Sequence, residues 1–158
     1  MISEKLREIR ECAEMSQVKV AKILGVQRST YSGWENNIDP IPFSMLYKFC
    51  NYFDIKIDYI CNLTKDKIGA LQKKELDLVK IGNRLRNIRL ENNDTQKTIS
   101  DVIGLDQSNY SKIEKGKYLI KLYPLIEFAK YYNISIDYIC GRSTNSEICK
   151  QKEKCLIN

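Results

Sequence analysis

The sequence predicts an all-α protein with two small helical domains in tandem, and two observations lead to this fold class. The chain of 158 residues matches itself at an offset of 79 residues: residues 4–62 and 83–141 share 20 identities in 59 aligned positions without a gap. In both copies, apolar residues recur at the spacing of amphipathic helices. Length alone would suggest a single domain, so the internal repeat changes the expected organisation to two domains.

A helix-turn-helix is expected in each copy because capping residues recur at the same places. Ser16 and Thr95 are favourable N-caps for a second helix. Gly25 and Gly104 stand where that helix must end, since glycine accepts the left-handed conformation of a residue that follows a helix. A third helix is expected to begin a few residues later. Two short helices around a tight glycine turn make a helix-turn-helix.

Two further helices complete each expected five-helix domain. The fourth follows Pro42 in the first copy, and the fifth carries the repeated segment Ile-Asp-Tyr-Ile-Cys at 57–61 and 136–140. Residues 65–81 contain no proline and one glycine, and their leucines give an apolar face, so we expect this linker to be helical. The expected domains are 1–64 and 82–142, followed by a tail over 143–158 that either forms a short helix or stays disordered.

Composition narrows the expected function. The chain has no histidine, which removes the commonest general base and the commonest metal ligand. No glycine-rich phosphate loop and no paired-carboxylate pattern stands in its place. We therefore expect a binding protein and not an enzyme, with no catalytic residue, no metal site and no cofactor.

Targeting signals and cysteine spacing indicate a cytoplasmic protein without a membrane partner. The segment from Met1 to Ala13 is charged and lacks the apolar stretch of a signal peptide. No apolar run approaches the ~20 residues of a membrane span. The six cysteines show no C-x-x-C spacing. Cys149 and Cys155 fall in the polar tail, where redox or metal sensing is an alternative to unreactive thiols.

The helix-turn-helix segments carry a family resemblance. SQVKVAKILGVQRSTYSGWEN (residues 16–36) and TQKTISDVIGLDQSNYSKIEKGK (residues 95–117) resemble the phage-repressor-like helix-turn-helix family, also called XRE (xenobiotic-response-element) or lambda-repressor-like. That family pairs Ser/Thr-Gln with a Gly eight residues after the Gln, then Ser and Glu in the recognition helix. The first copy departs from the pattern at 36–39, and Ser100 replaces the usual alanine in the second copy. The abundance of Ile, Lys, Asn and Tyr favours a bacterial or phage source.

The resemblance implies that the third helix of each copy lies in the major groove of double-stranded DNA. The residues expected to face base edges are Gln27, Arg28, Ser29, Thr30 and Gly33 in the first copy, and Asp106, Gln107, Ser108, Asn109 and Lys112 in the second. Arginine can bind guanine, and Gln or Asn can bind adenine. Gly33 offers no side chain, so the first copy should contact fewer bases. Asp106 either accepts from cytosine or caps its helix, and we favour the cap.

Other residues are expected to contact the DNA backbone. The resemblance implies a phosphate contact for Gln17 and Gln96, which open the second helix of each copy, and a helix N-terminus attracts phosphate in any case. The alternative is a solvated first-turn residue. Asn36, Lys115 and Lys117 follow the recognition helices and are expected at phosphates, with a solvated surface position as the alternative for each lysine.

Two recurring charge pairs are expected to be structural. Arg10 with Glu35, and Arg89 with Glu114, recur at the same separation in the two copies. The resemblance implies that each is a partly buried ion pair joining the first helix to the recognition helix. Removing one partner would leave an uncompensated charge, so these residues are assigned to the fold and not to DNA.

Together these expectations describe a sequence-specific transcriptional regulator, expected to be a repressor, that reads an asymmetric DNA site. Residues 1–64 carry 8 basic and 8 acidic side chains, and residues 82–142 carry 10 and 7, so the second copy should bind DNA more tightly. One alternative is that only domain 2 binds DNA while domain 1 is a dimerisation or partner-docking module. An antitoxin-like role, with a protein antagonist as partner, is a further alternative. A ~25 Å helical linker would allow an intramolecular pseudo-dimer to reach half-sites ~34 Å apart; otherwise the linker leucines would form a homodimer.

Overall fold

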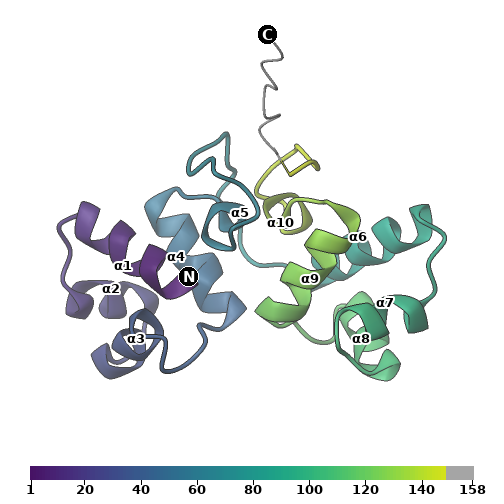
Figure 1. Ribbon diagram of the computed structural model, residues 1–158, viewed down its shortest axis with the longest axis horizontal. Coiled ribbons are helices and arrows are strands. Elements are labelled where there is room, and N and C mark those ends of the chain that lie inside the picture. The colour runs from purple at the N-terminus through teal and green to yellow at the C-terminus, as the bar shows by residue number, and fades with distance from the viewer. Residues whose placement is uncertain (149–158) are drawn as a thin grey trace, which may run out of the picture.

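The computed structural model describes residues 1–148, and within that range its regular structure is ten helices with one isolated β-bridge between Ile134 and Glu147. These helices form two groups that lie side by side (Figure 1). The first group is α1 (Ile2–Cys12), α2 (Gln17–Leu24), α3 (Arg28–Glu35), α4 (Phe43–Phe53) and α5 (Ile57–Ile60). The second is α6 (Leu78–Glu91), α7 (Gln96–Val102), α8 (Gln107–Glu114), α9 (Leu122–Tyr132) and α10 (Ile136–Ile139). The predicted all-α fold with two five-helix units is confirmed.

No helix in the described range is both long and apolar enough to cross a membrane. The part of the tail that the structure describes, residues 143–148, contains no helix. Cys149 and Cys155 lie outside the described residues.

Capping residues place the two helix-turn-helix segments as predicted. The hydroxyl of Ser16 accepts the backbone N–H of Lys19 at 3.2 Å, and Thr95 does the same for Thr98 at 3.0 Å. Each cap satisfies one of the backbone donors left free in the first turn of a helix. Gly25 ends α2 with a φ of 74°, a left-handed conformation that favours glycine. The chain therefore turns tightly from α2 into α3, and from α7 into α8.

The buried apolar residues of the two units form one cluster, to which equivalent residues of the repeat contribute. Fully buried equivalents include Leu6 and Leu85, Tyr31 and Tyr110, and Phe49 and Phe128. Burying one such side chain contributes about 1.5–3 kcal/mol, so the cluster stabilises both units. Cys61 and Cys140 are also buried, and burial raises the pKa of both thiols.

A buried ion pair joins the recognition helix of each unit to the helix that begins that unit. In the second unit, Arg89 on α6 donates from Nε and Nη2 to the two carboxylate oxygens of Glu114 on α8, at 2.6 and 2.9 Å. Its Nη1 also donates to the carbonyl oxygen of Asp94 in the following loop, at 2.9 Å. In the first unit Arg10 and Glu35 make the same two-pronged contact, at 2.6 and 3.1 Å. One guanidinium thus ties together two helices and a loop.

The electrostatics of this pair favour the charged form. Burial alone would raise the pKa of Glu114, but hydrogen bonds from Arg89 and Gln96 outweigh burial and hold that pKa below its ordinary value. The pKa of Glu35 is lowered for the same reasons. Both carboxylates therefore stay ionised under ordinary conditions, and each recognition helix stays attached through charge-assisted hydrogen bonds.

The prediction of a helical linker is wrong for residues 65–77. The structure begins α6 at Leu78, because the side chain of Asp77 caps it by accepting the N–H of Lys80 at 3.0 Å. Residues 78–81, which we expected in the linker, are the first turn of α6.

Backbone contacts with the two units explain why the linker is not helical. The N–H of Gln72 donates to the carbonyl oxygen of Arg142 at 2.7 Å, and the carbonyl oxygen of Lys74 accepts the hydroxyl of Tyr47 at 2.9 Å. These bonds use backbone groups that a helix would pair internally. Periodicity in the linker sequence cannot reveal them, because the partners lie far away in the chain.

The two units meet through α5 and α10, which lie at the centre of Figure 1. Each short helix has its N-terminus satisfied by an aspartate of the other unit. Asp58 accepts the N–H of Ile136 at 2.6 Å and the hydroxyl of Ser135 at 2.5 Å, while Asp137 accepts the N–H of Asp58 at 3.1 Å. The two aspartates are equivalent in the repeat, so the contact is close to reciprocal.

We expect Arg89→Met to lower the free energy of unfolding by about 3–5 kcal/mol, because it leaves the Glu114 carboxylate buried without a positively charged partner. Lys97→Met is the matched control, since Lys97 pairs with Asp101 at the surface, where both side chains are more than half exposed. That loss should be under about 1 kcal/mol. Urea denaturation followed by circular dichroism measures both values, and equal losses would contradict the structural role of the buried pair.

Asp58 predicts a pH dependence of stability. Burial, and then the charge of Asp137, raise the pKa of Asp58 from about 3.8 to about 7. Between these two values the folded chain holds a proton that the unfolded chain has lost. The free energy of unfolding should therefore fall as the pH rises from about 4 to 7. We expect Asp58→Asn to remove that part of the fall.

The measurement is urea unfolding at pH 5 and pH 8 for both proteins. Asp101→Asn, at an exposed carboxylate, is the control and should keep the fall seen in the unaltered protein. If Asp58→Asn shows the same fall as the unaltered protein, Asp58 does not titrate in this range.

Candidate nucleic-acid interface

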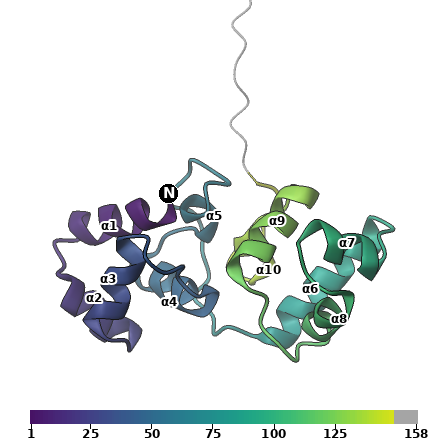
Figure 2. The same cartoon turned by 60° about the horizontal axis from the view of Figure 1, so that its bottom comes forward.

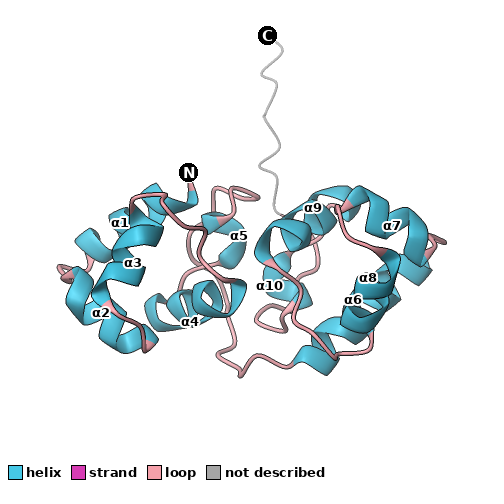
Figure 3. Cartoon of the chain, turned by 90° about the horizontal axis from the view of Figure 1, so that it is seen from below, coloured by secondary structure: helices cyan, strands magenta, loops and turns pink. Residues whose placement is uncertain are grey.

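The recognition helices α3 and α8 lie on one side of the molecule, one in each unit. They occupy the lower edge in Figure 1, and Figures 2 and 3 show the same arrangement turned toward the viewer. The N-terminal residues of both helices are exposed: Gln27, Arg28, Ser29 and Thr30 in the first unit, and Asp106, Gln107, Ser108 and Asn109 in the second. Lys112, in the middle of α8, is exposed as well, so nine of the ten predicted base-facing residues are at the surface of the two recognition helices.

Gly33 does not belong to that exposed set, which corrects the prediction. Gly33 is buried, and its carbonyl oxygen accepts the N–H of Ile38 at 2.9 Å. A Cβ at this position would lie 3.3 Å from the carboxylate of Asp39. The turn that follows α3 folds back over Gly33 and covers it. Its equivalent Lys112 is exposed, so the two recognition helices differ here in shape as well as in charge.

Asp106 occupies the N-cap position of α8, but the capping interpretation is wrong in its chemistry. The side chain makes no capping hydrogen bond to the backbone. Its Oδ2 instead accepts Nδ2 of Asn109 at 3.4 Å, a weak contact between two exposed side chains. The carboxylate and the amide are therefore both at the surface, where they could meet bases.

Gln17 and Gln96 have a role that neither interpretation of the sequence anticipated. Nε2 of Gln17 donates to Oε2 of Glu35 at 2.9 Å, and Nε2 of Gln96 donates to Oε2 of Glu114 at 2.7 Å. Both glutamines extend the buried ion pairs and tie α2 or α7 to the recognition helix. The signal in the sequence was their recurrence, together with the charge pairs, at the 79-residue offset.

The residues that follow the recognition helices differ between the units. Asn36 accepts Nη2 of Arg7 at 2.7 Å and donates to the hydroxyl of Ser32 at 3.1 Å. Lys115 and Lys117 are exposed, and within residues 1–148 neither side chain makes a hydrogen bond or ion pair. The second unit therefore presents free cations where the first presents a bonded amide.

A polar hollow beside α8 is lined in part by Arg86, which is not among the predicted site residues. Its volume is about 330 Å³. It is lined by Asn83, Arg86, Arg89, Gln96, Ser111, Glu114 and Lys115. Arg86 is exposed and is unpaired within the part of the chain that the structure describes. Arg7, its equivalent, is bonded to Asn36 and to the carbonyl oxygen of Glu35. The hollow of the second unit thus has two free cations, Arg86 and Lys115, at its rim.

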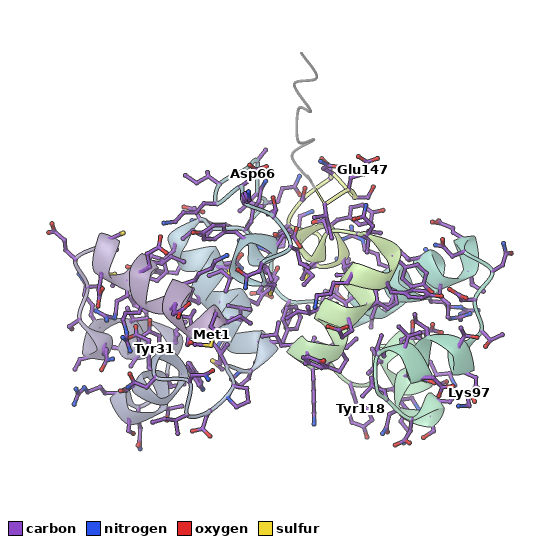
Figure 4. The ribbon with its side chains drawn as sticks, in the orientation of Figure 1. Met1, Tyr31, Asp66, Lys97, Tyr118 and Glu147 are labelled. Carbon is purple, nitrogen blue, oxygen red and sulfur yellow. The ribbon has the colours of Figure 1, made fainter. Side chains whose placement is uncertain are left out.

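The side of the molecule opposite the recognition helices is different. Asp66 and Glu147 lie there, whereas Tyr118 lies on the same side as α8 (Figure 4). Tyr118 is 60% exposed and follows Lys117 directly. An exposed aromatic ring therefore lies on the side that carries α8.

Two curated proteins are similar to this chain. YobD of Bacillus subtilis (strain 168), an uncharacterized HTH-type transcriptional regulator, is 28% identical over 76 residues, which cover 48% of this chain and 68% of YobD. RstR of Vibrio cholerae serotype O1 (strain ATCC 39315 / El Tor Inaba N16961), a cryptic phage CTXphi transcriptional repressor, is 39% identical over 69 residues. That match covers 44% of this chain and 62% of RstR, so less than two thirds of RstR is spanned.

One solved structure is also similar. It is the restriction-modification controller protein C.AhdI from Aeromonas hydrophila, with 30% sequence identity and a TM-score of 0.37. The match covers 42% of this chain and 98% of that chain.

A protein-family model matches the chain in both units. The model HTH_3, described as Helix-turn-helix, matches residues 6–60 and again residues 85–139. The first match runs from α1 through α5, and the second from α6 through α10. The two matches together cover more than half of the chain. The chain therefore belongs to the helix-turn-helix family and carries two copies of its domain.

Proposed function

We propose that the protein is a sequence-specific transcriptional regulator, and specifically a repressor, that binds one stretch of double-stranded DNA with both recognition helices. The observation that carries this proposal is the exposure of the N-terminal residues of α3 and α8 on one side of the molecule. The names of two relatives, an HTH-type transcriptional regulator and a phage transcriptional repressor, support it. In this proposal the protein acts by binding and catalyses no reaction.

The chemistry of the two helices suits unlike half-sites. Arg28 in the first unit can bind guanine O6 and N7, and Gln107 and Asn109 in the second can bind adenine N6 and N7. Lys112 adds a donor that Gly33 lacks. The proposed DNA site is therefore asymmetric, with one half read mainly through arginine and the other through amides and lysine.

One chain would supply both halves of the binding surface. Domain 1 (1–64) and domain 2 (82–142) would form an intramolecular pseudo-dimer, with α5 and α10 in the place of an interface between subunits. Support comes from the hydrogen bonds of Asp58 and Asp137, which link the two units within one polypeptide. Because the α5–α10 surface is used internally, a second chain is not needed to bring two recognition helices together.

A second candidate function follows from the difference in charge. Residues 1–64 have no net charge, and the free cations Arg86 and Lys115 lie in the second unit. In this alternative only domain 2 contacts DNA, while domain 1 docks a protein partner or antagonist. A hydroxyl-radical footprint on DNA selected from a random library separates the two: two protected half-sites support the proposal, and one supports the alternative. Light scattering on the complex should show one chain per site.

We expect Gln107→Ala with Lys112→Ala to weaken DNA binding more than Gln27→Ala with Arg28→Ala. The second unit has the greater positive charge, and both pairs of residues are exposed at the start or middle of a recognition helix. Each lost base contact should cost about 1–3 kcal/mol. Fluorescence anisotropy titrations on the selected DNA measure the losses, and equal losses would show that the two units contribute alike.

We propose that the exposed, unpaired Arg86 contacts a DNA phosphate. Phosphate contacts carry no sequence information, so Arg86→Ala should weaken binding to all DNA sequences alike. The slope of the logarithm of the DNA-association constant against the logarithm of the salt concentration is negative. Its magnitude should decrease by about 0.9, the value for one phosphate contact. Arg7→Ala is the matched control at the equivalent position, where Arg7 is bonded to Asn36; its slope should change less. A slope that Arg86→Ala leaves unchanged would remove Arg86 from the interface.

A further inference from the structure

Three positions at which the two copies differ lie together at the contact between the two units. Arg142 stands where the first copy has Leu63. Asn51 and Tyr47 stand where the second copy has a lysine and an isoleucine. These three departures, far apart in the sequence, meet around one guanidinium. The reciprocal aspartates are the symmetric part of the contact, and this cluster is the asymmetric part.

Arg142 is 1% exposed and bonds to both units. Within its own unit, Nη1 donates to a carboxylate oxygen of Asp137. Across the contact, Nε donates to Oδ1 of Asn51 on α4 at 2.8 Å, and Nη2 donates to the carbonyl oxygen of Ile55 at 2.9 Å. The guanidinium carbon lies 5.7 Å from the ring centre of Tyr47. All three nitrogens of the guanidinium therefore have partners, which offsets the cost of burying its charge.

The linker is held at the same place. The carbonyl oxygen of Arg142 accepts the N–H of Gln72 at 2.7 Å. The side chains of Tyr47 and Asn51 both donate to the carbonyl oxygen of Lys74, at 2.9 and 3.3 Å. Arg142 and its neighbours thus connect α4, the α4–α5 loop, the linker and α10. A planar guanidinium presents its donors in a fixed fork, so it sets the positions of these elements relative to one another.

We propose that Arg142 is a positioning residue that fixes the placement of α3 relative to α8, and thereby sets the number of base pairs between the two half-sites. This inference rests on the proposed function. Arg142 lies in neither recognition helix and touches no proposed DNA contact. Its effect on DNA binding is through geometry: two half-sites are bound together only when their separation matches that of two rigidly held helices.

The test uses the full-length protein and a set of DNA duplexes whose half-site separation is changed by one or two base pairs in either direction. The unaltered protein should bind one separation best. Arg142→Lys keeps a cation beside Asp137 but loses the fork, so binding at the best separation should weaken about 5–10-fold, with a smaller loss at the other separations. A flattened profile supports the proposal. A profile that is unchanged, or lowered equally at every separation, overturns it.

Two further variants separate positioning from folding. Arg142→Leu installs the residue of the first copy and should flatten the profile further. Arg84→Lys is the matched control: Arg84 donates to the carbonyl oxygens of Tyr138 and Ile139 within the second unit, so the profile should keep its optimum. An equal flattening in this control would mean that any arginine hydrogen-bonded to α10 has the same effect, which would overturn the assignment to Arg142.

Hydrogen exchange provides a readout that does not use DNA. The N–H groups of Asp58, Ile136 and Gln72 donate across the contact between units or from linker to domain. In Arg142→Lys they should exchange faster, while N–H groups inside α1 and α6 keep their protection; unchanged exchange at all three would overturn the proposal. If the unaltered protein needs only one half-site, the proposed function fails, and the exchange result still decides whether Arg142 holds the units together.

Discussion

The buried arginine–glutamate pair of each unit is the interaction on which the placement of the recognition helix depends. A helix of eight residues has little stability of its own, and both α3 and α8 have that length. Glu114 attaches α8 to Arg89, and Gln96 brings α7 to the same carboxylate. The exposed side of each recognition helix is thus free to vary in sequence, because the attachment is made entirely by its buried side.

A second cluster of polar side chains holds the two units together, as the ion pair holds each recognition helix in its unit. Asp58, Asp137 and Arg142 are nearly fully buried. Each makes a hydrogen bond across the contact: Asp58 accepts from Ile136, Asp137 accepts the N–H of Asp58, and Arg142 donates to Asn51. Buried polar groups are costly unless all are satisfied. The two units are therefore expected to hold one relative placement rather than slide over each other, as an apolar contact would allow.

Local signals in the sequence predicted most of the fold, while long-range contacts escaped prediction. Caps and glycines placed the helix-turn-helix segments because Ser16, Thr95 and Gly25 act on their immediate neighbours. The prediction of a helical linker failed because the linker backbone is bonded to Tyr47 and Arg142, and no local pattern in the sequence reveals these bonds. Of the candidate site, exposed residues such as Gln107 were predicted from the family resemblance, which matches them to positions of the recognition helix. The burial of Gly33 could not be predicted, because it depends on the turn that folds over this residue. The sequence also does not show that Arg86 is unpaired while its equivalent Arg7 is bonded to Asn36.

The contact between α5 and α10 has a consequence for how the protein would respond to its own abundance. When two DNA-binding units belong to separate chains, dilution dissociates the pair, and occupancy of a site falls with roughly the square of the concentration. Here the units share one polypeptide, so dilution cannot separate them. Under the proposed function, occupancy would follow a simple hyperbola down to very low copy number. A few molecules could then keep a promoter repressed. A single mutation in one recognition helix could also change the base preference at one half-site without changing the other.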